Sequence, residues 1–329
     1  MRFGILGYRH VHIEMFIQEM LQLGHTFIGI CEKNHQFAGP LAAKYGVTLI
    51  EDEEVFFDLE PDIIGTSEVN NKKIDIIEKC DKRCIHVMVD KPAVTNIKDY
   101  EKLSKIVDKD KIKVGMMLTE RFNPPIFSAW KLIKNGEIGE LISLTFMKPH
   151  RLREGSREPW HFSKTENGGI IIDLLIHDFD LIRWFTDSEI LDSYGYIRNA
   201  GHSRYPDFFD STNIIMKTQN GVVASLEADW RLPDKYWTWG DGRINCVGTC
   251  GRIEVKTVGD LAVKKEPYAT LITNDGEYRI LDNEPVPTSL TQDFLERIAG
   301  KKEVIITSTD ILKALHAALV VDERVINIK

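Results

Sequence analysis

The first 118 residues alternate short apolar runs with amphipathic stretches, and this alternation constrains the fold more than any other feature of the chain. Parallel strands need crossover connections long enough to hold a helix, and the spacing of the apolar runs leaves that room. The pattern therefore predicts an α/β fold with a doubly wound parallel sheet. The strand-like runs lie at 2–6, 26–31, 61–67, 85–90 and 111–118.

The pattern changes at the RFNPP segment, residues 121–125. Asn123 predicts a helix N-cap, with Pro124 at the first helical position and Gly136 after the last turn. We expect Arg121 to be structural, bracing the domain junction. A helix therefore opens the second part of the chain.

Length and strand content divide the chain into two predicted domains. A chain of 329 residues exceeds one ordinary core. Strand-like runs follow one another beyond residue 140, and no low-complexity linker interrupts them. We predict a first domain at 1–120 and a second, strand-rich α/β domain at 121–329.

Charge and composition exclude several classes of protein. The formal net charge is −8 and no long basic block is present, so we expect no nucleic-acid partner. No apolar run reaches the roughly 20 residues of a membrane-spanning helix, so we expect no membrane association. The opening MRFGILGYRH leads into a strand instead of a signal peptide, and five cysteines are an odd number for a disulfide framework. We therefore expect a cytoplasmic protein.

The turn after the first strand lies where a dinucleotide-binding fold places its phosphate loop. Gly7 is the one glycine of the G-x-G-x-x-G fingerprint that this turn keeps. Glu32 ends the second strand, where an acid would bind the adenosine ribose and repel a 2′-phosphate. The acid at position 32 therefore favours NAD over NADP. The positive charge of Lys33 beside Glu32 weakens that preference and leaves NADP as the alternative. Arg9 and His10 could contact phosphate or be exposed, and Gly7 and Glu32 could be only a tight turn and a solvated strand end.

Lys91 follows the apolar run at 85–90, within the sequence Asp-Lys-Pro. Ligands of open α/β sheets bind outside the carboxyl ends of the strands. Lys91 could therefore face a cleft, or it could simply extend into water.

The segment GGIIIDLLIHDFD, residues 168–180, places three aspartates and a histidine in an apolar run. In a single helix, Asp173, His177, Asp180 and Trp184 share one stripe. A carboxylate one turn from an imidazole can orient it and raise its basicity, as a general base requires. The alternatives are a core Asp–His pair, aspartates favoured by the helix dipole, or a metal pair lacking a third ligand.

Bulky aromatic and cationic residues lie between the first strand of the second domain and this segment. They could line a substrate cleft and would suit a polyhydroxylated or acidic ligand, or they could form a mobile surface loop. These residues are His150, Arg151, Arg153, Trp160 and His161.

Together these segments resemble the Gfo/Idh/MocA family, named from glucose-fructose oxidoreductase and inositol dehydrogenase. The resemblance rests on GILGYRH with Glu32, VMVDKP, RFNPP followed by IGELISL, and GGIIIDLLIHDFDLIRWF, in this order. It implies an N-terminal Rossmann domain and a C-terminal α/β domain with a large, mostly antiparallel sheet that usually forms the interface of a homodimer or homotetramer. It also implies an NAD- or NADP-dependent oxidoreductase acting on hydroxyl or carbonyl carbons of sugars, inositols and polyols.

The resemblance also implies roles for individual residues. Lys91, Asp173 and His177 match the catalytic positions, and no metal is expected. Lys73 replaces the histidine of the cofactor loop usually written T-P-N-x-x-H, and Asp90 replaces the glutamate before Lys-Pro. The cofactor-binding residues that we predict are Gly7, Arg9, His10, Glu32, Asn70, Lys91 and Pro92.

Our hypothesis is that His177 takes the proton of a substrate hydroxyl while hydride leaves the same carbon for the nicotinamide. Asp173 would orient His177 or bind the substrate, and Lys91 would stabilise alkoxide character. Two alternatives are a non-catalytic nucleotide- or sugar-sensing regulatory protein, favoured by the altered phosphate loop, and an NAD-assisted lyase or hydrolase.

Overall fold

The computed structural model describes residues 1–328, which form two compact units. The first unit also takes up two segments beyond the boundary predicted at residue 120. The first unit comprises 1–118, 165–168 and 288–316, and the second comprises 119–164, 169–287 and the chain from 317 onward.

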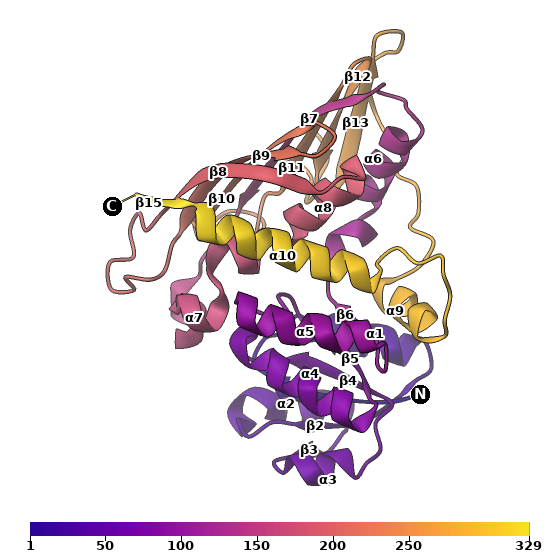
Figure 1. The fold of residues 1–329 in the computed structure, drawn as a ribbon, viewed down its shortest axis with the longest axis vertical. Helices are drawn as coiled ribbons and strands as arrows, with labels where there is room; N and C mark the ends of the chain where they lie inside the picture. The colour runs from indigo at the N-terminus through magenta and orange to yellow at the C-terminus, as the bar shows by residue number, and fades with distance from the viewer. Residues whose placement is uncertain (329) are drawn as a thin grey trace. The chain divides into compact units, whose positions relative to one another are not determined.

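The first unit contains a six-stranded sheet in the order β3-β2-β1-β4-β5-β6 (Figure 1). All its neighbouring strands are parallel, which confirms the predicted doubly wound sheet. Both faces of such a sheet are covered, so its strands are almost continuously apolar. The strands are β1 (Arg2–Tyr8), β2 (Thr26–Cys31), β3 (Leu49–Ile50), β4 (Ile63–Ser67), β5 (His86–Val89) and β6 (Val114–Met116).

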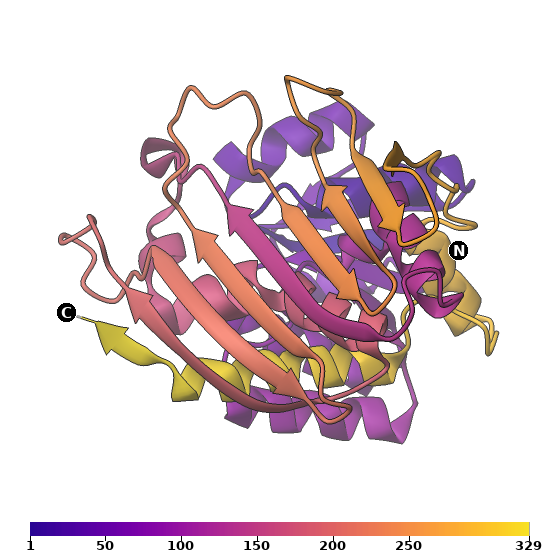
Figure 2. The same ribbon diagram turned by 90° about the horizontal axis from the view of Figure 1, so that it is seen from above.

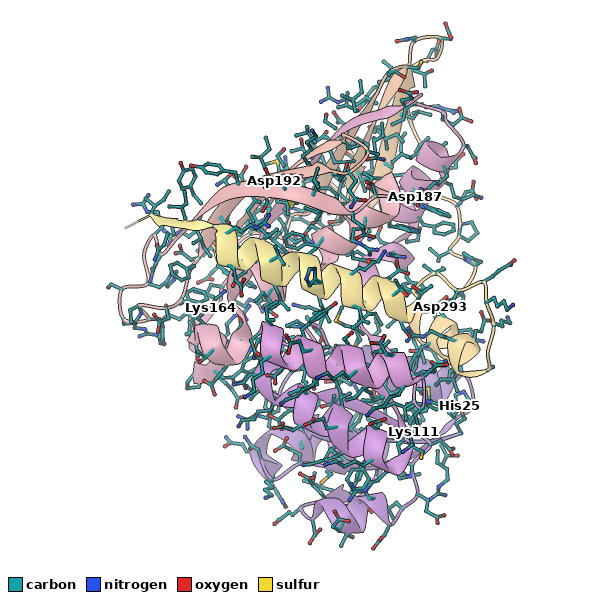
Figure 3. The ribbon with its side chains drawn as sticks, viewed as in Figure 1. His25, Lys111, Lys164, Asp187, Asp192 and Asp293 are labelled. Atoms are coloured by element: carbon teal, nitrogen blue, oxygen red, sulfur yellow. The ribbon has the colours of Figure 1, made fainter. Side chains whose placement is uncertain are left out.

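The helices of this unit begin and end at local signals. The Asn34 side chain accepts a hydrogen bond from the Phe37 amide at the start of α2, and Gly46 ends that helix with φ of 64°. On α9, the carboxylate of Asp293 (Figure 3) accepts hydrogen bonds from two backbone amides of the following loop. The helices are α1 (Ile13–Gln22), α2 (His35–Tyr45), α3 (Glu53–Phe57), α4 (Lys73–Arg83), α5 (Ile97–Lys109) and α9 (Leu290–Ile298), and α10 (Ser308–Arg324) continues into the second unit.

The second unit contains a nine-stranded sheet in the order β14-β13-β12-β11-β7-β10-β9-β8-β15 (Figure 2). The β7–β10 and β8–β15 pairs are parallel and the others are antiparallel, so the predicted large, mostly antiparallel sheet is confirmed. The strands are β7 (Leu141–Pro149), β8 (Ile190–Arg198), β9 (Ser211–Thr218), β10 (Val223–Asp229), β11 (Arg243–Gly248), β12 (Gly251–Lys256), β13 (Tyr268–Thr273), β14 (Arg279–Ile280) and β15 (Ile326–Ile328).

Helices α6 (Pro124–Lys134) and α8 (Ile176–Thr186) pack against this sheet. Buried and exposed residues alternate strictly along β9, as in a strand with one face toward a core. Asn123 is the N-cap residue of α6 and Pro124 its first residue, as predicted. Among residues 1–328, no helix combines the length and the apolar character needed to cross a membrane.

Candidate active site

The predicted phosphate loop connects β1 to α1 in the first unit. Gly7 has φ of +77°, and a Cβ atom added there would lie 2.8 Å from the Cβ of Glu68, so only glycine fits without strain. Beside it lies a cavity of about 320 Å³ whose lining includes Gly7, Arg9, Glu32 and Lys33. Four residues singled out from the sequence are thus brought together around one cavity.

Glu32 is buried, with 8% of its surface exposed, and is not a solvated strand end. Its Oε2 accepts a hydrogen bond from the Tyr8 amide at 2.9 Å, and its Oε1 accepts one from the Asn34 amide at 2.8 Å. Each carboxylate oxygen keeps a second lone pair that a ribose hydroxyl could use. Glu32 therefore fixes the turns after β1 and β2 and can still accept hydrogen bonds from a nucleotide.

His10 and the Asp-Lys-Pro turn meet in this unit. The His10 Nδ1 lies 2.8 Å from Asp90 Oδ2, and the His12 Nδ1 lies 3.4 Å from Asp90 Oδ1. Burial lowers the pKa of His10. Burial would raise the pKa of Asp90, but His12, Lys73 and the hydrogen bonds from both histidines hold it well below its usual range. Asp90 is therefore ionised, and it orients both imidazoles.

Lys73 is a functional candidate, although in the sequence it stands out only as a departure from the family pattern. Its ammonium is buried and donates to Asn70 Oδ1 at 2.8 Å, to the Asp90 carbonyl at 2.7 Å and to the Pro92 carbonyl at 3.3 Å. It thus connects predicted cofactor residue Asn70 to the turn that carries Lys91. The sequence signal that could have identified Lys73 is its position in the first turn of a helix, where the helix dipole favours acidic side chains over basic ones.

His10, His12 and Asp90 are also the described residues that could hold a metal ion, since one ligand atom from each lies within 4.8 Å of the others. Two imidazoles and a carboxylate suit Zn²⁺ or Fe²⁺. The Lys73 charge acts on the same carboxylate, which reduces its attraction for a cation.

In the second unit, residues 168–180 do not form the single helix that was predicted. A π-helical turn (Ile170–Leu174) holds Asp173, Leu175 interrupts the helix, and His177 is the second residue of α8. The predicted stripe from Asp173 through His177 is therefore wrong as a feature of one α-helix. Short π-helical turns of this kind are frequent at functional sites.

The aspartates of this segment differ in their surroundings. Asp180 forms a bidentate pair with Arg121, with Nε–Oδ2 at 2.8 Å and Nη2–Oδ1 at 2.6 Å. Asp178 lies 2.9 Å from the Lys148 ammonium, and burial raises the pKa of Asp178 although Lys148 opposes the shift. Both are buried, whereas Asp173 and His177 are half-buried. Two of the three aspartates of the segment therefore form buried ion pairs, and the predicted catalytic residues are less deeply buried.

The predicted substrate residues fall into two groups. His150 packs edge-on against Trp230, with ring centroids 5.6 Å apart, and Arg151 lies over Trp239. Trp160 is buried and stacks on His161 at 3.7 Å. The structure also brings Arg157, which was not predicted, over the ring of Trp230.

Two family models match the chain. The model described as oxidoreductase family, NAD-binding Rossmann fold, matches residues 1–117, and the GFO/IDH/MocA C-terminal domain matches residues 128–254. The chain belongs to the Gfo/Idh/MocA family. It is an oxidoreductase of this family, with an NAD-binding Rossmann domain.

Individual Gfo/Idh/MocA relatives match across different shares of the chain. An inositol 2-dehydrogenase of Rhizobium meliloti is 24% identical over 96% of this chain and 94% of its own length. A myo-inositol 2-dehydrogenase of Thermotoga maritima is 25% identical, and the match spans 65% of this chain and 60% of that protein. A solved structure from Erwinia carotovora atroseptica shares the fold with a TM-score of 0.91, at 24% identity and complete coverage of both chains.

Proposed function

We propose that this chain is an NAD-dependent dehydrogenase that transfers a hydride between the nicotinamide and a CH–OH carbon of a cyclitol- or sugar-like polyol. The substrate class is supported by the near full-length match to an inositol 2-dehydrogenase. The observation that carries the assignment of residues is the exposure pattern of 168–180. Asp178 and Asp180 are buried in ion pairs with Lys148 and Arg121, and Asp173 and His177 are half-buried.

The first unit fits a dinucleotide. The absence of a side chain at Gly7 leaves room beside a cavity, and the cavity is lined by Arg9 and Lys33 as well as by Glu32. Gly7, Arg9 and Glu32 would hold the adenosine half, with the Glu32 carboxylate on the ribose hydroxyls. Asn70, Lys91 and Pro92 would hold the other half. Bound NAD⁺ supplies the hydride acceptor.

Proton movement falls to residues of the second unit. His177 accepts the proton of the substrate hydroxyl, and Asp173 orients the imidazole or binds a neighbouring hydroxyl. By its match to the family's catalytic lysine, Lys91 would stabilise negative charge on the substrate oxygen. Lys73 positions Lys91 by holding the carbonyls of Asp90 and Pro92.

The His177→Ala variant tests these roles. We expect unchanged NAD⁺ affinity in calorimetry and a fall in turnover on the order of 10²–10⁴-fold, the usual contribution of general base catalysis. Unchanged turnover would remove His177 from the mechanism. Failure of the unaltered protein to bind NAD⁺, NADH, NADP⁺ or NADPH would refute the dinucleotide assignment and favour the sensing alternative.

We also propose that the protein is a cytoplasmic homodimer or homotetramer. Apolar side chains exposed on the strands of the nine-stranded sheet support an interface there. They include Ile142, Leu191, Tyr194, Ile215 and Val223. Analytical ultracentrifugation of the unaltered protein tests the assembly, and a monomer at micromolar concentration would refute it.

A further inference from the structure

Three arginines of the second unit gather around one indole ring. Their guanidinium carbons lie 5.8, 5.3 and 5.4 Å from the ring centroid of Trp239 for Arg151, Arg153 and Arg157 in turn. Arg157 also lies 4.6 Å from the ring centroid of Trp230. We call these five residues the arginine–tryptophan cluster.

The sheet topology explains why these residues meet. Strands β7 and β10 are parallel neighbours, and Pro149 pairs with Asp229 where both strands end (Figure 2). The loop after β7 carries the arginines, and the loop after β10 carries the tryptophans. The Arg151 amide donates to the Trp239 carbonyl at 2.9 Å, which fastens one loop to the other. The cluster is therefore built by the fold and is not an accident of long surface side chains.

The five residues of the cluster include no carboxylate, and no ion pair in the described part of the chain joins its arginines to one. Within residues 1–328, no carboxylate oxygen lies within 4.0 Å of a guanidinium nitrogen of Arg151, Arg153 or Arg157. The nearby Glu154 pairs with Arg204, and Glu158 accepts a hydrogen bond from Trp160. Like charges held this close repel one another, and a bound anion would relieve that repulsion.

Arg157 is the member best prepared to bind an anion. Its Nε donates to the Leu152 carbonyl at 2.6 Å, which fixes the plane of the guanidinium. Its two Nη groups have no hydrogen-bond acceptor among the described residues. The Nη groups of a fixed guanidinium match the two oxygens of a carboxylate or phosphate.

Arg157 belongs to the same unit as the predicted catalytic residues Asp173 and His177, and the Asp173 charge acts on it. Burial lowers the pKa of its guanidinium, and the carboxylate that opposes this shift is Asp173. Both residues belong to the second unit. A group bound by Arg157 would therefore lie in the unit that also carries Asp173 and His177.

We propose that the arginine–tryptophan cluster binds an oxyanion of the substrate, so that the polyol oxidised by this enzyme is itself anionic. This inference rests on the proposed dehydrogenase function. The shared chemistry is a carboxylate, as in a sugar acid, or a phosphate ester. The ring hydroxyls remain for Asp173 and His177.

The test compares glucose, glucuronate and glucose 6-phosphate, which share one ring and differ at one carbon. Initial rates with NAD⁺ are measured for the unaltered enzyme and for Arg157→Gln, Arg153→Gln and Arg157→Lys. Arg252→Gln is the matched control, since Arg252 is an exposed arginine of β12 in the same unit. Calorimetry with glucuronate and with inorganic phosphate gives a readout independent of turnover.

We expect kcat/KM for at least one anionic sugar to exceed that for glucose by tenfold or more. In Arg157→Gln, kcat/KM for that anionic sugar should be about 10- to 100-fold lower, as expected for the loss of a charged hydrogen bond. Arg153→Gln, at an exposed position, should lose a smaller part, Arg157→Lys should recover part, and Arg252→Gln should change nothing. Preference for glucuronate identifies a carboxylate, and preference for glucose 6-phosphate identifies a phosphate ester.

Two outcomes separate this inference from the proposed function. If glucose and other neutral polyols are oxidised as well as the anionic sugars, and the arginine variants match the control, the anion site is refuted and the dehydrogenase stands. If no substrate is oxidised but Arg157-dependent binding of glucuronate or phosphate is measured, the anion site stands and the dehydrogenase proposal fails. Absence of both binding and anion preference overturns the inference.

Discussion

The buried Arg121–Asp180 pair should dominate the stability of the second unit. Each side chain is 2% exposed, and two hydrogen bonds of 2.8 and 2.6 Å join them. Asp180→Asn removes the negative charge and leaves the Arg121 guanidinium buried against a neutral amide. Breaking one partner of such a pair typically costs about 3–5 kcal/mol. In a unit of this size, that corresponds to a fall in melting temperature of about 6–20 °C.

The assay is thermal and urea unfolding of the unaltered protein, Asp180→Asn, and the double variant Arg121→Met with Asp180→Leu. Replacing both partners of a buried pair by apolar residues is often neutral, and a methionine can keep the contact that Arg121 makes with Trp184. The double variant should therefore be more stable than Asp180→Asn. A loss below about 1 kcal/mol in Asp180→Asn, or a double variant less stable than the single one, would show that the ion pair is not what holds this helix in place.

Three further expectations concern the first unit. Gly7→Ala, at φ of +77°, should destabilise the unit by about 1 kcal/mol or more and weaken NAD⁺ binding in calorimetry. Unchanged affinity would contradict the proposal that this loop binds the dinucleotide. Lys73→Met removes the donor shared by Asn70 and the Asp-Lys-Pro turn. Turnover should therefore fall at least tenfold, and NAD⁺ affinity should fall by a smaller factor. Equal losses of turnover and affinity would argue for general misfolding. His86 Nδ1 accepts the Lys113 amide, and burial followed by the Lys113 charge lowers its pKa. The pKa of His86 in the folded protein lies below its unfolded value, so its contribution to stability is present above pH 6.5 and is lost as the pH falls through the lowered pKa. The free energy of unfolding of His86→Gln should therefore vary less with pH over that window than that of the unaltered protein.

Local sequence signals were sufficient for much of the fold. Apolar runs alternating with helical patterns predicted the parallel sheet, because a strand buried on both faces must be apolar along its length. Asn123 and Pro124 marked the start of a helix, because backbone preferences act within one turn. By contrast, the sequence does not mark which face of β8 is buried, since Leu191, Tyr194 and Tyr196 are exposed and the buried positions are Gly195 and Ile197.

The candidate site divides in the same way. Gly7, Glu32, Lys91, Asp173 and His177 could be singled out because their order and spacing resemble one family. The sequence could not show that Asp178 and Asp180 are structural ion pairs, because their partners Lys148 and Arg121 lie 30 and 59 residues away in the sequence, and only packing brings them together.

By itself, the sequence determined the alternation of strands and helices in the first 118 residues, where the glycine of the phosphate loop falls, and which polar groups enter an apolar run. These are consequences of local sterics and periodicity. Only the tertiary structure decided that the predicted catalytic helix breaks at Leu175, that Lys73 joins Asn70 to the Asp-Lys-Pro turn, and that Arg157 meets Trp230. The contacts of Lys73 and Arg157 join residues of different segments. Their free energy exists only once the sheets and helices are packed, so no local pattern encodes them.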